Sequence, residues 1–141
     1  MKALIDTCVL VDFLQKRSPF DSDARDVMML VASNFVEGCT TAKAVTDIYY
    51  LAHRMTHNND EARKIIAGLL TIVNVMDTKG ADAQQALSSP VSDYEDAVMT
   101  ETAKREKADC IVTRNIKDYT KAGIPVFTPA DFVQKIRESL E

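Results

Sequence analysis

The chain has 141 residues, about the length of one domain, and can bury a sizeable apolar core. Its composition is 46% hydrophobic and 27% charged, without a Pro- or Gly-rich tract, which argues against disorder and marks no domain boundary. The formal net charge of −4 argues against nucleic-acid binding through a basic surface, unless bound cations offset the acidic side chains. We therefore expect a single domain over residues 1–141.

The beginning of the chain and its cysteines bear on the cellular compartment. MKALID has a short apolar run that ends at an aspartate, so it predicts neither a signal peptide nor a membrane span. Cys8, Cys39 and Cys110 are odd in number and widely spaced, which argues against a disulfide framework or a thiolate zinc site. We expect reduced thiols, a cytoplasmic location and no membrane partner.

The first half of the chain alternates short apolar runs with segments of helical periodicity. It predicts, in order, a strand at 3–5, a helix after Asp6, a helix at 22–36 that Gly38 terminates, a strand at 39–41, helices at 42–55 and 60–70, and a strand at 71–76.

The second half continues this alternation and has clearer helix starts. Ser92 and Glu95 have the S-x-x-E form of a capping box, which predicts a helix that runs to about Lys107. Thr128 and Pro129 predict the N-cap and first residue of a closing helix. The other predicted elements are a short helix at 82–87, a strand at 110–113, a loop through Asp118 and Gly123, and a strand within 124–127.

Strands that alternate with helices predict an α/β fold with a mainly parallel central sheet and helices on both faces. Ligands of such sheets bind at the carboxyl ends of the strands. Four aspartates can reach that edge: Asp6 follows the first strand, Asp47 lies in the helix after the second, Asp96 begins a helix and Asp118 follows a buried strand.

Clustered carboxylates repel one another, and a shared cation makes the cluster tolerable. Oxygen ligands favour Mg²⁺ or Mn²⁺. Two such ions can activate water and stabilise the leaving oxygen during attack on a phosphodiester, which needs no nucleophilic side chain. The pattern thus predicts a metal site at Asp6, Asp47, Asp96 and Asp118.

Three segments carry a resemblance to a known family. They are L-I-D-T-C-V-L-V-D-F-L at Leu4–Leu14, D-Y-E-D-A-V at Asp93–Val98 and I-V-T-R-N-I-K-D-Y at Ile111–Tyr119. They resemble the PIN-domain family, and the similarity continues to the T-P-A-D-F-V segment near the end of the chain. Small prokaryotic PIN proteins, which include toxins of the VapC type, are the most similar members.

The resemblance implies a three-layer PIN-like domain that acts as a metal-dependent endoribonuclease. It makes Asp6 and Asp96 metal ligands and places Asp47 at the family's second acid, which is usually Glu. It also implies Mg²⁺ or Mn²⁺ as cofactor, RNA as substrate, a small antitoxin protein as partner and a homodimer.

The family's fourth motif commonly reads T-x-D, whereas this chain has Thr113 and Asn115 at its ends. Asp118 is the nearest carboxylate and takes the fourth metal position, with Thr113, Asn115 and Asp93 as polar support. Cys8 stands where the family usually has Asn, so the resemblance implies that one hydrogen-bonding group beside the metal is missing.

Simpler structural roles remain open for these acids. Asp6 can be a helix N-cap, and Asp47 can pair with Lys43 one turn earlier. Glu95 suits the capping box, Asp93 and Asp96 suit a helix N-terminus, and Asp118 can be an ordinary loop acid. Candidates for a phosphate-facing basic rim are Arg17, Lys43, Arg54, Arg114 and Lys117.

Two other functions compete with the ribonuclease. The first is a PIN-like module without catalysis that binds RNA or a protein, which Cys8, Asp47 and Asn115 motivate. The second is phosphoryl transfer through an aspartyl phosphate, which wants a second acid at the position of Cys8. Asp12 lies too far along the following helix to replace that acid.

Overall fold

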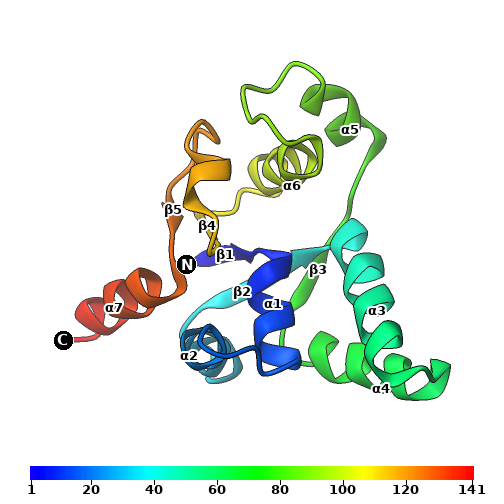
Figure 1. Cartoon of the computed structure of the whole chain (residues 1–141). Helices are drawn as coiled ribbons and strands as arrows, with labels where there is room; N and C mark the ends of the chain where they lie inside the picture. Colours follow the sequence, from blue (N-terminus) through cyan, green and yellow to red (C-terminus); the bar gives the residue numbers. More distant parts are fainter.

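The computed structural model describes the whole chain, residues 1–141, as one five-stranded parallel sheet with helices on both faces (Figure 1). The sheet order is β3-β2-β1-β4-β5. The strands are β1 (Lys2–Ile5), β2 (Glu37–Thr41), β3 (Asn74–Met76), β4 (Cys110–Val112) and β5 (Val126–Phe127). The α/β prediction is confirmed, and every strand pair is parallel.

The central strand β1 sets the position of the sheet's functional edge. Leu4 lies opposite Cys39 of β2 on one side and Ile111 of β4 on the other. From β1 the chain adds β2 and β3 on one side and later adds β4 and β5 on the other side. The direction in which strands are added therefore reverses at β1. In open parallel sheets this reversal leaves a crevice beyond the carboxyl ends of the strands.

Two apolar cores lie on the two faces of the sheet. One core contains Ala3 and Ile5 of β1 and packs against α1 (Thr7–Leu14), α2 (Asp21–Ala32), α4 (Asn59–Leu70) and α7 (Pro129–Ser139). The other core contains Leu4 and packs against α5 (Gly80–Ala86), α6 (Tyr94–Arg105) and η1 (Ile116–Tyr119). Because successive side chains of a strand point to opposite faces, β1 is buried on both sides.

The remaining helix, α3 (Ala42–Thr56), begins directly after β2 and contributes to both cores through Ala44 and Ile48. Its N-cap is Thr41, whose hydroxyl accepts the backbone N–H of Ala44. The α3 helix therefore starts at the carboxyl edge of the sheet, which brings Lys43 and Asp47 to that edge. No helix in the structure is long and apolar enough to span a membrane.

The predicted end of α2 was wrong. The helix ends at Ala32, and Asn34 adopts a left-handed conformation with φ 63°. Gly38, predicted to terminate the helix, instead lies inside β2, where a Cβ atom would be 2.7 Å from both γ-carbons of Val31. The glycine is needed because α2 packs so closely on the strand.

The predicted capping box of α6 was also wrong. Asp93 is the N-cap, and its carboxylate accepts the backbone N–H of Asp96. Glu95 therefore remains free to pair with Lys43. The start of α7 is confirmed, with Thr128 as N-cap and Pro129 as first residue.

Candidate active site

Asp6 lies at the carboxyl end of β1 and is the N-cap of α1. Its Oδ1 accepts the backbone N–H of Thr7 at 2.9 Å, and its side chain is largely buried, with 7% of the residue exposed. The capping role is thus real. It does not exclude ligation, since the same carboxylate also faces the crevice beside β4.

Two side chains hold the other oxygen of Asp6. The buried hydroxyl of Thr113 donates to Oδ2 at 2.7 Å, and the thiol of Cys8 donates to the same oxygen at 3.4 Å. Thr113 immediately follows β4, so the two adjacent strand ends meet at this contact. Burial and the charge of Asp6 raise the pKa of the Cys8 thiol to about 11, and the thiol stays protonated as a donor.

Tyr119 joins Asp6 to Asp96. Its buried hydroxyl lies 3.2 Å from Oδ1 of Asp6 and 3.0 Å from Oδ1 of Asp96. A phenol has a single proton, so it donates to one carboxylate at a time. Burial, followed by the charges of the two aspartates, raises the pKa of Tyr119, which keeps it a neutral donor.

Asp96 lies in the first turn of α6 and is only partly exposed. Burial raises the pKa of its carboxyl group to about 6, the hydrogen bond from Tyr119 opposes this shift, and the charges of Asp6, Asp93 and Asp118 add to it. Like charge therefore accumulates around Asp96, and no basic side chain pairs with it.

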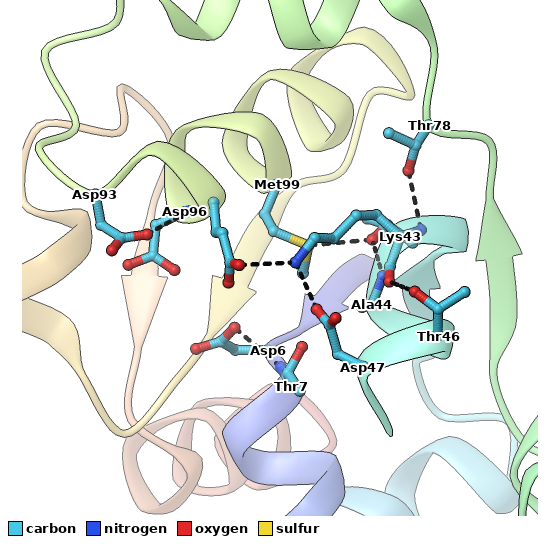
Figure 2. A network of polar contacts seen from close by, with 12 residues as sticks. Asp6, Thr7, Lys43, Ala44, Thr46, Asp47, Thr78, Asp93, Asp96 and Met99 are labelled. Atoms are coloured by element: carbon cyan, nitrogen blue, oxygen red, sulfur yellow. Dashed lines mark hydrogen bonds and ion pairs between the residues drawn. The ribbon is translucent and has the colours of Figure 1, made fainter. Parts of the chain in front are cut away.

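Asp6 and Asp96 open into a pocket of about 370 Å³ at the carboxyl edge of the sheet. Asp47 of α3 reaches the same pocket. The pocket is lined by Asp6, Thr7, Lys43, Asp47, Tyr50, Leu51, Glu95, Asp96 and Met99. Figure 2 shows Lys43 and Asp47 extending from α3 and Asp6 extending from the end of β1 toward a common space, while Asp96 extends from α6 nearby.

Lys43 forms ion pairs with two of the acids in this pocket. Its Nζ lies 2.5 Å from Asp47 and 3.2 Å from Glu95. Partial burial lowers the pKa of Lys43, but the hydrogen bonds from its ammonium to both carboxylates outweigh it and leave the pKa raised. The expected ion pair between Lys43 and Asp47 is thus present inside the candidate site.

Asp118 and Asp93 lie outside this pocket. Both are exposed and line a separate hollow of about 160 Å³ together with Lys117 and Lys121. Asn115 is exposed, and its backbone N–H donates to the hydroxyl of Thr113 at 3.0 Å. Asn115 thus supports Thr113 through its backbone. No group of three or more His, Cys, Asp or Glu side chains is arranged to hold a metal ion.

The basic side chains proposed for a phosphate-facing rim have different partners in the structure. Arg114 forms two bonds to buried Asp12, at 2.6 and 3.2 Å, and its guanidinium lies 4.1 Å from the centre of the Phe20 ring. Its Nε and Nη2 atoms are thus committed to Asp12. Arg17 bonds to Gln15, whereas Lys43 does line the pocket.

Tyr119 and the contact between Lys43 and Glu95 were not predicted from the sequence. Tyr119 directly follows Asp118, but only the turn of η1 buries it while leaving Asp118 exposed. The i, i+1 spacing in a tight helix could have indicated that these two neighbours face different directions. No local signal in the sequence joins Lys43 to a residue in α6.

A family model described as PIN domain matches residues 2–117, which includes Asp6, Asp47, Asp96 and Thr113. The chain belongs to the PIN domain family. Among curated proteins, none matches it.

Solved structures share this PIN domain fold at low sequence identity. VapBC2 from Rickettsia felis, bound to a DNA fragment from its promoter, is 14% identical, with 89% of this chain and 97% of that chain covered and a TM-score of 0.70. VapC20 of Mycobacterium tuberculosis, described as a toxin that cleaves the sarcin-ricin loop, is 16% identical, with 86% and 95% covered and a TM-score of 0.65. A toxin-antitoxin complex from Klebsiella pneumoniae is 22% identical, with 90% and 97% covered and a TM-score of 0.65.

Proposed function

We propose that this PIN domain is a metal-dependent endoribonuclease that hydrolyses phosphodiester bonds of RNA. The observation that carries the proposal is the shared contact of Tyr119 with Asp6 and Asp96, which holds two carboxylates together in an open pocket. Membership of the PIN family and the fold shared with VapC20 support the reaction class.

The donor chemistry of the pocket suits a hard divalent cation. Asp6 and Asp96 supply carboxylate oxygens, which Mg²⁺ and Mn²⁺ prefer over the softer ligands that zinc or copper take. We assign Asp6 and Asp96 as the principal metal ligands and Asp47 as a further acid of the same pocket. Asp118 is the outermost of the four proposed acids, and its charge still reaches Asp96.

A divalent cation held there would activate water and stabilise the leaving oxygen of a phosphodiester. The protein's own residues orient the metal-binding carboxylates and do not attack the phosphodiester themselves. Thr113 and Cys8 fix the rotation of the Asp6 carboxylate, and Tyr119 keeps Asp96 beside it. Because the Cys8 thiol has a pKa of about 11, it stays protonated at neutral pH and cannot act as a thiolate nucleophile.

We further assign a small antitoxin protein and a second copy of the chain as partners. Structures of similar fold are toxin-antitoxin complexes, including those from Rickettsia felis and Klebsiella pneumoniae. Light scattering of the purified chain would measure its oligomeric state. A monomer at every concentration tested would remove the homodimer from this proposal.

The decisive assay incubates purified protein with a mixed RNA pool in EDTA, Mg²⁺ or Mn²⁺. We expect cutting with either metal, none in EDTA, and none from the Asp96→Asn variant, whose neutral amide is a much weaker ligand. Asp60→Asn is the matched control, because Asp60 is exposed on α4, away from the pocket, and this variant should cut like the parent.

The competing candidate is a PIN module that binds RNA or protein without cutting. The observation in its favour is Lys43, which already engages Asp47, one of the four proposed metal ligands. Absence of cutting by the parent under every metal condition, with retained RNA binding, would establish this candidate and reject the ribonuclease.

A further inference from the structure

Lys43 is the one basic side chain in a pocket lined by four acidic ones. Asp47, one of its partners, lies one turn further along α3, and Glu95, the other, lies in the first turn of α6. Lys43 therefore reaches from α3 to α6 across the pocket. In Figure 2 its amino group faces the same space as the carboxylates of Asp6 and Asp47.

The ammonium offsets part of the negative charge of Asp47 and Glu95 and leaves Asp6 and Asp96 without a cationic partner. Asp47 and Glu95 each contact the positive charge directly. The partners of Asp6 are a backbone N–H, two hydroxyls and a thiol, and the partner of Asp96 is the Tyr119 hydroxyl. The negative charge that remains without a cationic partner is therefore concentrated on Asp6 and Asp96.

A second divalent ion beside Asp47 would meet this ammonium. Paired metal ions in nucleases lie about 3.5–4 Å apart and share the carboxylates between them. One carboxylate oxygen of Asp47, Oδ2, already accepts a hydrogen bond from Lys43 at 2.5 Å. An ion bound by Asp47 would thus either displace Lys43 or lie close to its ammonium, and like charges at short distance repel one another.

We propose that Lys43 takes the place of a second divalent cation, so that the pocket binds one Mg²⁺ or Mn²⁺ ion between Asp6 and Asp96. This inference rests on the proposed metal-dependent function and specifies how its site is built. Lys43 is then a positioning residue: it acts through Asp47 and sets the number of ions.

Isothermal titration of the full chain with MnCl₂ tests the inference without any activity measurement. We expect one ion for the parent and for Lys43→Arg, which keeps the charge. Lys43→Met should gain a second ion, because Asp47 and Glu95 lose their cation. The double variant Lys43→Met with Asp47→Asn should return to one ion. Lys64→Met is the control, since Lys64 forms an exposed pair with Glu61 on α4 and should bind as the parent does.

Electron paramagnetic resonance of the parent with saturating Mn²⁺ gives a second measurement that needs no variant. An uncoupled Mn²⁺ spectrum is expected, and the spin-coupled spectrum of a close ion pair would overturn the inference. Two ions in the parent titration, or a single ion in folded Lys43→Met, would overturn it as well. An absence of Mn²⁺ binding by the parent is a different result, because it would remove the proposed metal-dependent function itself.

Discussion

The hydroxyl group of Tyr119 lies 3.0 Å from a carboxylate oxygen of Asp96, although the two residues belong to separate elements, η1 and α6. The same hydroxyl reaches Asp6 at 3.2 Å. One neutral hydroxyl thus lies between two acids that repel one another, and it can donate its proton to either of them. The stability of the protein without metal should therefore depend on this phenol.

Replacing Tyr119 with Phe removes that donor and leaves the ring in place. A buried group that loses its hydrogen-bond partner costs about 1–3 kcal/mol, so we expect the metal-free variant to lose stability in this range. The loss should shrink in saturating Mn²⁺, because the ion then neutralises the two carboxylates. Urea unfolding with and without Mn²⁺ measures both effects.

Tyr50→Phe is the control for this experiment, because Tyr50 lines the same pocket but is 65% exposed. Its unfolding free energy should match that of the parent. Equal stability of Tyr119→Phe and the parent without metal would show that the bridging hydroxyl contributes nothing to the fold.

Asp96→Asn should stabilise the metal-free protein at neutral pH while abolishing cutting. The folded state raises the pKa of Asp96 from its ordinary value of 3.8 to about 6. Between these two values the folded protein binds the proton more tightly than the unfolded chain, so the parent loses stability as the pH rises. The variant lacks this loss. Unfolding curves from pH 3 to pH 8 should therefore diverge between about pH 4 and pH 6, and parallel curves would contradict the prediction.

The pair of Asp82 and Arg105 should contribute stability with the opposite pH dependence. Arg105 donates to both carboxylate oxygens of buried Asp82 at 2.8 and 2.9 Å, which lowers the pKa of Asp82 from 3.8 to about 2. Hydrogen bonds to charged groups are worth about 1.5–3 kcal/mol, so Asp82→Asn should destabilise the protein by roughly that amount at pH 7.

The stabilisation by Asp82 is fully present above about pH 4 and is lost as the pH falls through about 2, because the unfolded chain binds the proton first. Thermal melts of parent and variant should thus converge in this acidic range. Glu106→Gln serves as control, since Glu106 pairs with the same arginine from a more exposed position and should cost less than about 1 kcal/mol. A gap between parent and Asp82→Asn that persists below pH 2 would refute the assignment.

Gly38→Ala should destabilise the fold by about 1–3 kcal/mol, the usual cost of an extra carbon in a packed core. The added Cβ would lie 2.7 Å from two carbons of Val31. Val31→Ala in the same chain should recover part of the loss, because it removes both of those carbons. Chemical denaturation of the single and double variants measures this coupling.

Gly68→Ala is the matched opposite case. Gly68 lies within α4, and a Cβ there would meet nothing within 4 Å. Alanine is a better helix former than glycine by about 1 kcal/mol, so this variant should be more stable than the parent. If both alanine variants shifted stability in the same direction, the close packing of α2 on β2 would not be the cause.

The order of the elements and the acids available to the sheet edge can be predicted from the amino-acid sequence alone. These features depend on local patterns: apolar runs before Asp6 and Thr113, helical periodicity in α3, and the Thr128 and Pro129 start of α7. Hydrophobic periodicity and helix capping depend on residues only a few positions apart. They can therefore be recognised in the sequence. The family motifs added the expectation of a PIN domain.

Which of these acids come together depends on the tertiary fold. Asp6 and Asp96 converge through Tyr119, which is 113 and 23 residues away along the chain, while Asp118 next to Tyr119 points to another hollow. Lys43 forms an ion pair with Glu95 on a different helix. Gly38 does not end a helix, and its missing side chain allows α2 to pack closely on β2. Such contacts depend on how two cores orient separate elements across one sheet, and no local spacing in the sequence specifies that orientation.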